Sequence, residues 1–148
     1  MKNMKIQEPT LITAINHNVG RPFCARHYDC WAFLRGVYAD AYGIILPALP
    51  GTDPDDATAA HAALERLRTA GDWLPVDPGD ERSGDAVIMG RFPLASHHCG
   101  IWIVADGIGR IAHCDRVGGV QCQTVAQLHA LGWSGFRWYR HHRRQDAA

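Results

Sequence analysis

The feature that most constrains the fold is a change in hydrophobic pattern near residue 73. Before this point apolar residues recur at helical spacing, whereas after it they form short runs separated by Gly, Pro and Asp. Short apolar runs bounded by turn residues are typical of strands. We expect strands over residues 85–89, 98–104, 109–113 and 136–140. Helices followed by a mostly antiparallel sheet predict an α+β fold.

The clearest helix is expected over residues 30–42. Its apolar residues fall on one helical face: Phe33, Leu34, Val37, Tyr38 and Ala41. Asp29 is placed to cap the N-terminus of this helix, and Gly43 to end it.

Four further local features complete the sequence-based prediction. A peripheral helix is expected over residues 54–70, because Pro54 suits a first turn and the two acidic residues after it favour the positive end of the helix dipole. A short helix over residues 124–131 is expected to end at Gly132, and Asp106-Gly107 to form a tight turn. Residues 1–20 show little helical periodicity and are expected to be an irregular lead-in.

Composition narrows the class of protein. A chain of 148 residues with 47% hydrophobic residues has the size and apolar content of one globular domain. Its formal net charge of zero disfavours a nucleic-acid-binding protein. The five cysteines have no regular spacing, so a secreted disulfide framework is not indicated. We recognise no signal peptide and no apolar run long enough to insert into a membrane, and expect synthesis in the cytoplasm.

Cys30 is the first candidate for chemistry. It stands at the start of the 30–42 helix, where free backbone N–H groups and the helix dipole favour the thiolate. Most free cysteines are buried and inert, so a catalytic role for Cys30 requires a base close to its thiol. His98 starts one predicted strand and His113 ends the next, so an antiparallel pair places the two imidazoles side by side. Strand alternation alone does not distinguish His97 from His98.

A metal site is the main chemical alternative. Cys24, His27 and Cys30 have ligand-like spacing, and further His and Cys residues follow at 97–99 and 113–114. The pattern lacks a matching second pair of ligands, so we expect no metal.

Three segments of the sequence resemble the NlpC/P60 cysteine peptidases. They are Gly20-Arg-Pro-Phe23, Tyr28-Asp-Cys-Trp31 with the helix that follows, and His98-Cys-Gly-Ile101 after a Ser83-Gly-Asp85 strand start. The Asp-Cys-Trp order and the closing segment at 136–140 are similar to the phage-tail branch. The resemblance covers residues 20–140, which we expect to form the peptidase domain between a lead-in (1–19) and a basic C-terminal tail (141–148).

This resemblance implies a papain-like α+β fold in which the helix carrying the cysteine packs on a mostly antiparallel sheet. It implies Cys30 as nucleophile, His98 as base and His113 as the orienting residue, with no cofactor. The oxyanion and substrate cleft is expected to involve Tyr28, Asp29 and Phe23. Many members have Tyr where this chain has Phe23, so Tyr28 or a backbone donor such as the Cys30 N–H is expected to take its place.

The implied activity is thiol-dependent hydrolysis of amide bonds in peptidoglycan stem peptides, typically beside a D-γ-glutamyl residue. The implied setting is a phage virion, with tail-tip or hub proteins as partners. A non-catalytic role in tail-tip assembly is the alternative. The basic end of the chain is expected to be solvated, with contact to anionic wall polymers or a tail protein as the functional alternative: Arg137, Arg140, His141, His142, Arg143 and Arg144.

Overall fold

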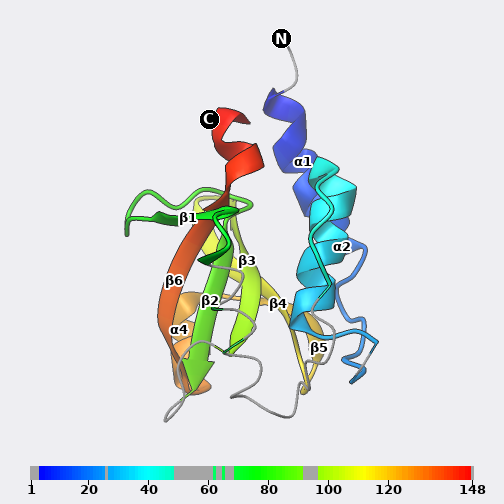
Figure 1. The fold of residues 1–148 in the computed structure, drawn as a ribbon. Coiled ribbons are helices and arrows are strands. Elements are labelled where there is room, and N and C mark those ends of the chain that lie inside the picture. The colour runs from blue at the N-terminus through cyan, green and yellow to red at the C-terminus, as the bar shows by residue number, and fades with distance from the viewer. Residues whose placement is uncertain are drawn as a thin grey trace.

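The computed structural model describes residues 4–25, 27–48, 62, 65, 69–91 and 97–147. Its helices are α1 (Met4–Asn16), α2 (Cys30–Tyr42), α4 (Val125–Ala130) and the 3-10 helix η1 (His142–Ala147). Its strands are β1 (Trp73–Val76), β2 (Ala86–Arg91), β3 (His98–Ala105), β4 (Ile108–Asp115), β5 (Gly119–Gln123) and β6 (Trp133–His141). The strands form one antiparallel sheet in the order β1-β6-β2-β3-β4-β5 (Figure 1), which confirms the α+β prediction.

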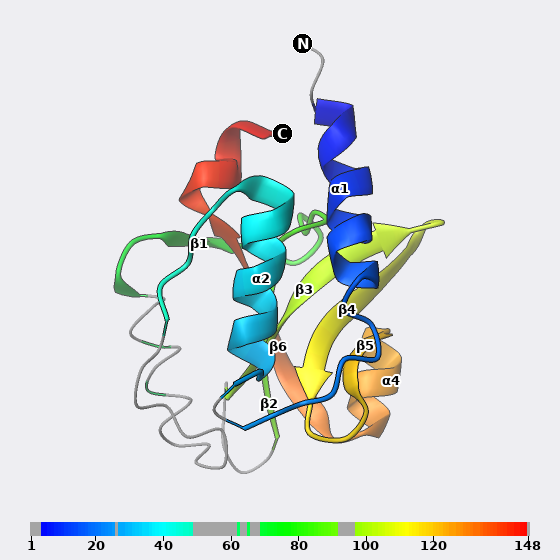
Figure 2. The same cartoon turned by 90° about the vertical axis from the view of Figure 1, so that its right-hand side faces the viewer.

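Helices cover both faces of the sheet. α1 and α2 lie on one face, and α4 lies on the other, against β6 and β4 (Figures 1 and 2). Two apolar clusters follow this division. The larger includes Phe33 and Leu34 of α2 with Ile101 and Cys114 of the sheet, and the smaller joins Leu128 of α4 to Val87, Met89, Ile111 and Trp133. Each fully buried apolar side chain contributes about 1.5–3 kcal/mol.

The structure confirms the predicted boundaries of α2. The Asp29 carboxylate accepts a hydrogen bond of 2.9 Å from the Ala32 N–H, and Gly43 ends the helix with a φ of 65°. All five residues of the expected apolar face contribute to the larger cluster, four of them buried and Ala41 half-buried. Capping and periodicity therefore act together to place Cys30 in the first turn of α2.

The four expected strands and two smaller features are also confirmed. β3, β4 and β6 extend the predicted segments by one to three residues at an end, and β2 begins one residue later than predicted and ends two residues later. Asp106 and Gly107 both have positive φ values, 53° and 74°, as a tight hairpin turn requires. Thr124 caps α4, where its hydroxyl accepts from the Gln127 N–H. The helix expected over 54–70 falls almost entirely outside the described residues.

The prediction of an irregular lead-in at the N-terminus is wrong. Residues 4–16 form α1, which packs beside α2 and buries Leu11, Ala14 and Ile15. A helix with weak periodicity is stabilised mainly by such tertiary contacts. Among the described helices, none is long and apolar enough to cross a membrane.

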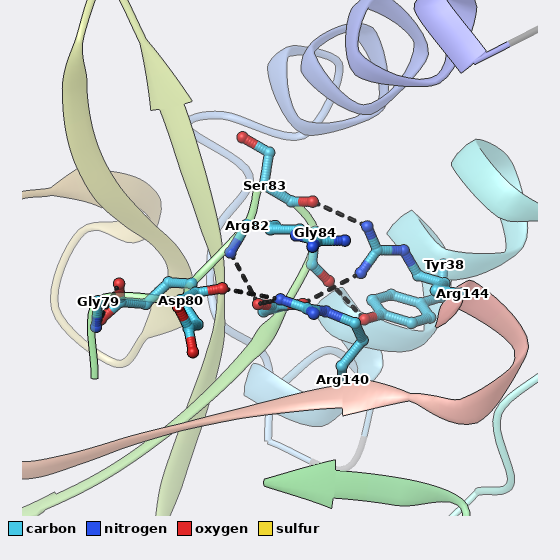
Figure 3. Close-up of polar contacts among 10 residues, drawn as sticks. Tyr38, Gly79, Asp80, Arg82, Ser83, Gly84, Arg140 and Arg144 are labelled. Carbon is cyan, nitrogen blue, oxygen red and sulfur yellow. Dashed lines mark hydrogen bonds and ion pairs between the residues drawn. The ribbon is translucent and has the colours of Figure 1, made fainter. Parts of the chain in front are cut away.

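The expectation of a solvated basic end is wrong for part of the segment. Arg140 donates to both oxygens of the buried Asp85 carboxylate, at 2.8 and 2.7 Å (Figure 3). Arg144, only 9% exposed, donates to the same carboxylate at 3.3 Å and to the Ser83 carbonyl oxygen at 2.8 Å. His141 is also buried. The expectation failed because Asp85, 59 residues before Arg144, binds both guanidinium groups.

The backbone conformation and close neighbours of residue 84 explain why it is a glycine. Its φ is +97°, and an added Cβ would lie 2.2 Å from the Tyr42 hydroxyl and 2.6 Å from Nη2 of Arg144. The Tyr38 hydroxyl donates to the Gly84 carbonyl oxygen (Figure 3). The Gly84-Asp85 pair therefore joins α2, the start of β2 and η1.

Candidate active site

Cys30 combines partial exposure with two hydrogen-bonding neighbours. It is the first residue of α2 and is half-buried. Hydrogen bonds link its thiol to the Cys99 thiol and to His98. The Cys99 bond and then the charge of His98 hold the pKa of Cys30 well below its usual range, although burial acts in the opposite direction. This lowered pKa favours the thiolate form of Cys30.

The two predicted histidines lie in contact. His98 Nε2 lies 2.9 Å from His113 Nδ1, and the two rings are perpendicular. His98 is 6% exposed and His113 is fully buried. Burial, followed by the charge of His98, lowers the pKa of His113 to about 4, so His113 is neutral at pH 7. The structure thus brings Cys30, His98 and His113 together.

The structure distinguishes His98 from His97. His98 contacts His113, whereas the His97 ring packs against Trp133, with 5.4 Å between ring centroids. Strand alternation separates neighbouring side chains: Cys99 and Cys114 belong to the cluster under α2, whereas His98 stacks on Trp133 of the opposite cluster. His98 is the first residue of β3, and its ring still interacts with Cys30 at the start of α2.

Gly100 is required by the close approach of β3 and β4. A Cβ at this position would lie 2.6 Å from the Ala112 carbonyl oxygen and 3.1 Å from the His113 Cβ. The first of these neighbours is backbone, which cannot move without shifting β4. The glycine in His98-Cys99-Gly100 therefore keeps His113 within reach of His98.

Sequence reasoning missed two residues that hold the histidines. Gln123 Oε1 lies 2.7 Å from His113 Nε2, and the Trp133 ring stacks on His98 with a centroid separation of 4.6 Å. Gln123 lies on β5, a strand that was not predicted. The Gly118-Gly119 pair followed by alternating Val120 and Cys122 is the signal that identifies it. Trp133 lies before the strand predicted over residues 136–140, and it is buried.

The three expected cleft residues have different surroundings. Asp29 caps α2, and burial raises the pKa of its carboxyl group. Tyr28 is buried, and its hydroxyl donates to Asn18 at 3.2 Å. Phe23 packs on the larger cluster, with the Arg116 guanidinium 5.1 Å from its ring centroid. The Tyr28 hydroxyl is therefore already engaged with Asn18.

Among the described residues, the remaining cysteines and the candidate metal ligands do not form a second site. Burial raises the pKa of Cys114 to about 12 and also raises that of Cys122. Cys24 and His27 are exposed. In the described ranges, no group of three or more His, Cys, Asp or Glu side chains has an arrangement suited to a metal ion.

This arrangement is suited to nucleophilic attack on a carbonyl carbon. It supplies a thiol with a lowered pKa, an imidazole that accepts its proton, and a neutral second imidazole that orients the first.

Comparison with known proteins agrees with this chemistry. No curated protein matches the chain. The profile of the NlpC/P60 family matches residues 18–134, a range that contains Cys30, His98, His113 and Gln123. Members of this family are generally cysteine peptidases that act on peptidoglycan, although some are inactive. Because the match covers most of the sequence, the chain belongs to the NlpC/P60 family.

Proposed function

We propose that this protein is a cysteine endopeptidase that hydrolyses γ-D-glutamyl amide bonds in peptidoglycan stem peptides. The observation that carries the proposal is the contact between His98 and His113, at 2.9 Å, beside a Cys30 thiol whose pKa is lowered. A protein with only an assembly role has no need for this set of side chains. The γ-D-glutamyl specificity rests on the resemblance of the motifs.

The reaction starts with proton transfer from the Cys30 thiol to His98. The thiolate attacks the substrate carbonyl carbon, and a carbon–sulfur bond forms while the carbonyl oxygen becomes an oxyanion. Backbone N–H groups at the start of α2 stabilise that oxyanion. His98 then gives its proton to the amide nitrogen, the carbon–nitrogen bond breaks, and the amine leaves a thioester on Cys30.

A water molecule completes the cycle. His98 takes a proton from the water as its oxygen attacks the thioester carbon. The carbon–sulfur bond breaks, the peptide leaves with a new carboxylate, and the Cys30 thiolate is restored. His113 stays neutral throughout and keeps the His98 ring in place.

Digestion of purified peptidoglycan tests the proposal. Mass spectrometry of the released muropeptides is expected to show a free γ-carboxyl group on D-glutamate and one new amino terminus for each cleavage. A synthetic peptide with an α-linked glutamate serves as the specificity control and is expected to be cleaved poorly. Equal release by the wild type and Cys30→Ala would overturn the catalytic proposal. Equal cleavage of α- and γ-linked peptides would overturn only the specificity.

For the biological setting, we propose a phage tail tip, with hub proteins as partners. The support is the resemblance of the Asp29-Cys30-Trp31 order and of the closing segment at 136–140 to the phage-tail branch. Peptide mass spectrometry of purified phage tails is expected to detect the protein. Its absence from tails, together with its presence in cell extracts, would contradict this setting. Phe23, where many active members have Tyr, favours a non-catalytic assembly role, which is the outcome if tails contain the protein but peptidoglycan is not cleaved.

A further inference from the structure

Gln123 connects β5 to the histidine pair. Gln123 pairs with Ile111 of β4, two residues before His113, so the Gln123 and His113 side chains lie on the same face of the sheet. Its Oε1 atom lies 2.7 Å from His113 Nε2. A carbonyl oxygen only accepts hydrogen bonds, so His113 Nε2 is the donor. β3, β4 and β5 lie side by side in the sheet (Figure 2). The His98–His113 and His113–Gln123 contacts therefore join one side chain from each strand into a row.

This contact determines the tautomers of both histidines. A neutral imidazole carries one proton, so a His113 ring protonated on Nε2 has an unprotonated Nδ1. That Nδ1 atom accepts from His98 Nε2, 2.9 Å away. A neutral His98 protonated on Nε2 has its lone pair on Nδ1. The row therefore leaves His98 Nδ1 as the atom that takes the Cys30 proton.

We infer that Gln123 is a positioning residue that, through His113, holds His98 in the tautomer required to deprotonate Cys30. The catalytic consequence of this inference rests on the proposed peptidase function. The tautomer of His98 itself can be observed without any substrate. After proton transfer from Cys30, the His98 imidazolium still donates from Nε2 to His113, so the row of hydrogen bonds is unchanged during the reaction.

A neutral amide at residue 123 suits this role better than a carboxylate. His113 faces His98 from β3, Cys30 from α2, Asp115 on its own strand and Gln123 from β5. Burial keeps its pKa at about 4. A carboxylate at 123 would raise that pKa by about 1–3 units. Once protonated, His113 would donate from Nδ1 to His98 Nε2 and leave His98 with the wrong tautomer.

Two substitutions test the inference, with a matched control. Gln123→Leu removes the acceptor, so His113 is no longer held in one tautomer. Gln123→Glu keeps an acceptor of the same shape and adds a charge. Gln121→Leu is the control, because Gln121 is the cross-strand neighbour of His113 but its side chain donates to backbone oxygens of its own turn and not to His113.

The readouts are nitrogen NMR shifts of the His98 ring and the rate of Cys30 alkylation by iodoacetamide, followed by peptide mass spectrometry as a function of pH. For Gln123→Leu we expect mixed tautomers at His98 and alkylation at pH 7 slowed by about tenfold, with hydrolysis falling in parallel. For Gln123→Glu we expect wild-type behaviour at high pH and a new acidic loss between about pH 5 and 7. The Gln121→Leu variant is expected to match the wild type in every readout.

The outcomes separate this inference from the proposed function. If the wild type cleaves no peptidoglycan but Gln123→Leu still changes the His98 tautomer and Cys30 alkylation, the inference stands and the peptidase proposal fails. If both Gln123 variants keep the wild-type tautomer and pH profile, Gln123 is only a packing residue, even when the enzyme is active. Should Gln123→Leu not fold, the pH profile of Gln123→Glu decides the question alone.

Discussion

The buried Asp85 carboxylate offers a test of how the C-terminal segment is held. Asp85 is fully buried and accepts from Arg140, Arg144 and the Arg82 N–H (Figure 3). Substitution of Asp85 by Asn keeps the shape but removes the charge. The substitution also replaces one carboxylate oxygen by an NH2 group that faces the N–H donors. Each Asp85 oxygen accepts two hydrogen bonds, so two of the four bonds are lost.

The structure allows an estimate of the cost of this change. Each hydrogen bond to a charged group is worth about 1.5–3 kcal/mol, and breaking a buried ion pair costs about 3–5 kcal/mol. The Arg140 side chain is 16% exposed and the Arg144 side chain is 9% exposed. Water can therefore solvate part of the two guanidinium groups and reduce the loss of stability. We therefore expect Asp85→Asn to lower the free energy of unfolding by about 3 kcal/mol. For a chain of this size, that corresponds to a fall in Tm of about 6–12 °C.

Urea unfolding followed by tryptophan fluorescence measures this loss. Asp80→Asn is the matched control, because Arg140 hydrogen-bonds the backbone carbonyl oxygen of Asp80, whose carboxylate is exposed. The control is expected to change stability by less than about 0.5 kcal/mol. A loss in Asp85→Asn no larger than that of the control would refute the argument that this carboxylate anchors β6 and η1. Arg144→Met combined with Asp85→Asn is expected to be less damaging than the sum of the two single changes.

Three further predictions concern the site. The pKa of His113 is about 4 in the folded protein and about 6.5 in the unfolded chain, so the unfolded state takes up the proton at the higher pH. The free energy of unfolding is therefore expected to fall by about 3 kcal/mol between pH 6.5 and pH 4. Urea titrations in which a His113→Gln variant keeps this pH dependence would argue against the prediction. Gly100→Ala is expected to lower kcat by at least about tenfold, since the added Cβ displaces β4 and His113; unchanged kcat contradicts this reading. Cys99→Ala is expected to raise the pKa of Cys30, measured by alkylation against pH, whereas Cys114→Ala, the control, is expected to leave it lowered.

Local sequence was enough to predict the elements whose own residues determine them. Asp29, the apolar face and Gly43 specify α2, and Asp106-Gly107 specifies the hairpin between β3 and β4. The His98–His113 contact followed from that hairpin together with strand alternation. The choice of His98 over His97 needed the family resemblance, because alternation alone permits either face.

The features missed by prediction depend on contacts between distant residues. α1 is stabilised by packing beside α2, which its own weak periodicity does not reveal. The burial of Arg144 depends on Asp85, and no terminal charge pattern indicates that pairing. The role inferred for Gln123 depends on the register of β5 against β4. The hydrogen bond between Cys99 and Cys30 depends on how α2 crosses the sheet.

The central claim is that Cys30, activated by His98, hydrolyses peptidoglycan amide bonds. The most direct test is the rate of new amino-terminus formation from peptidoglycan for the wild type, Cys30→Ala and the control Cys24→Ala, in which an exposed cysteine is removed. We predict that Cys30→Ala loses at least about 10³-fold in rate and that Cys24→Ala equals the wild type. Hydrolysis that persists at the wild-type rate in Cys30→Ala would contradict the account.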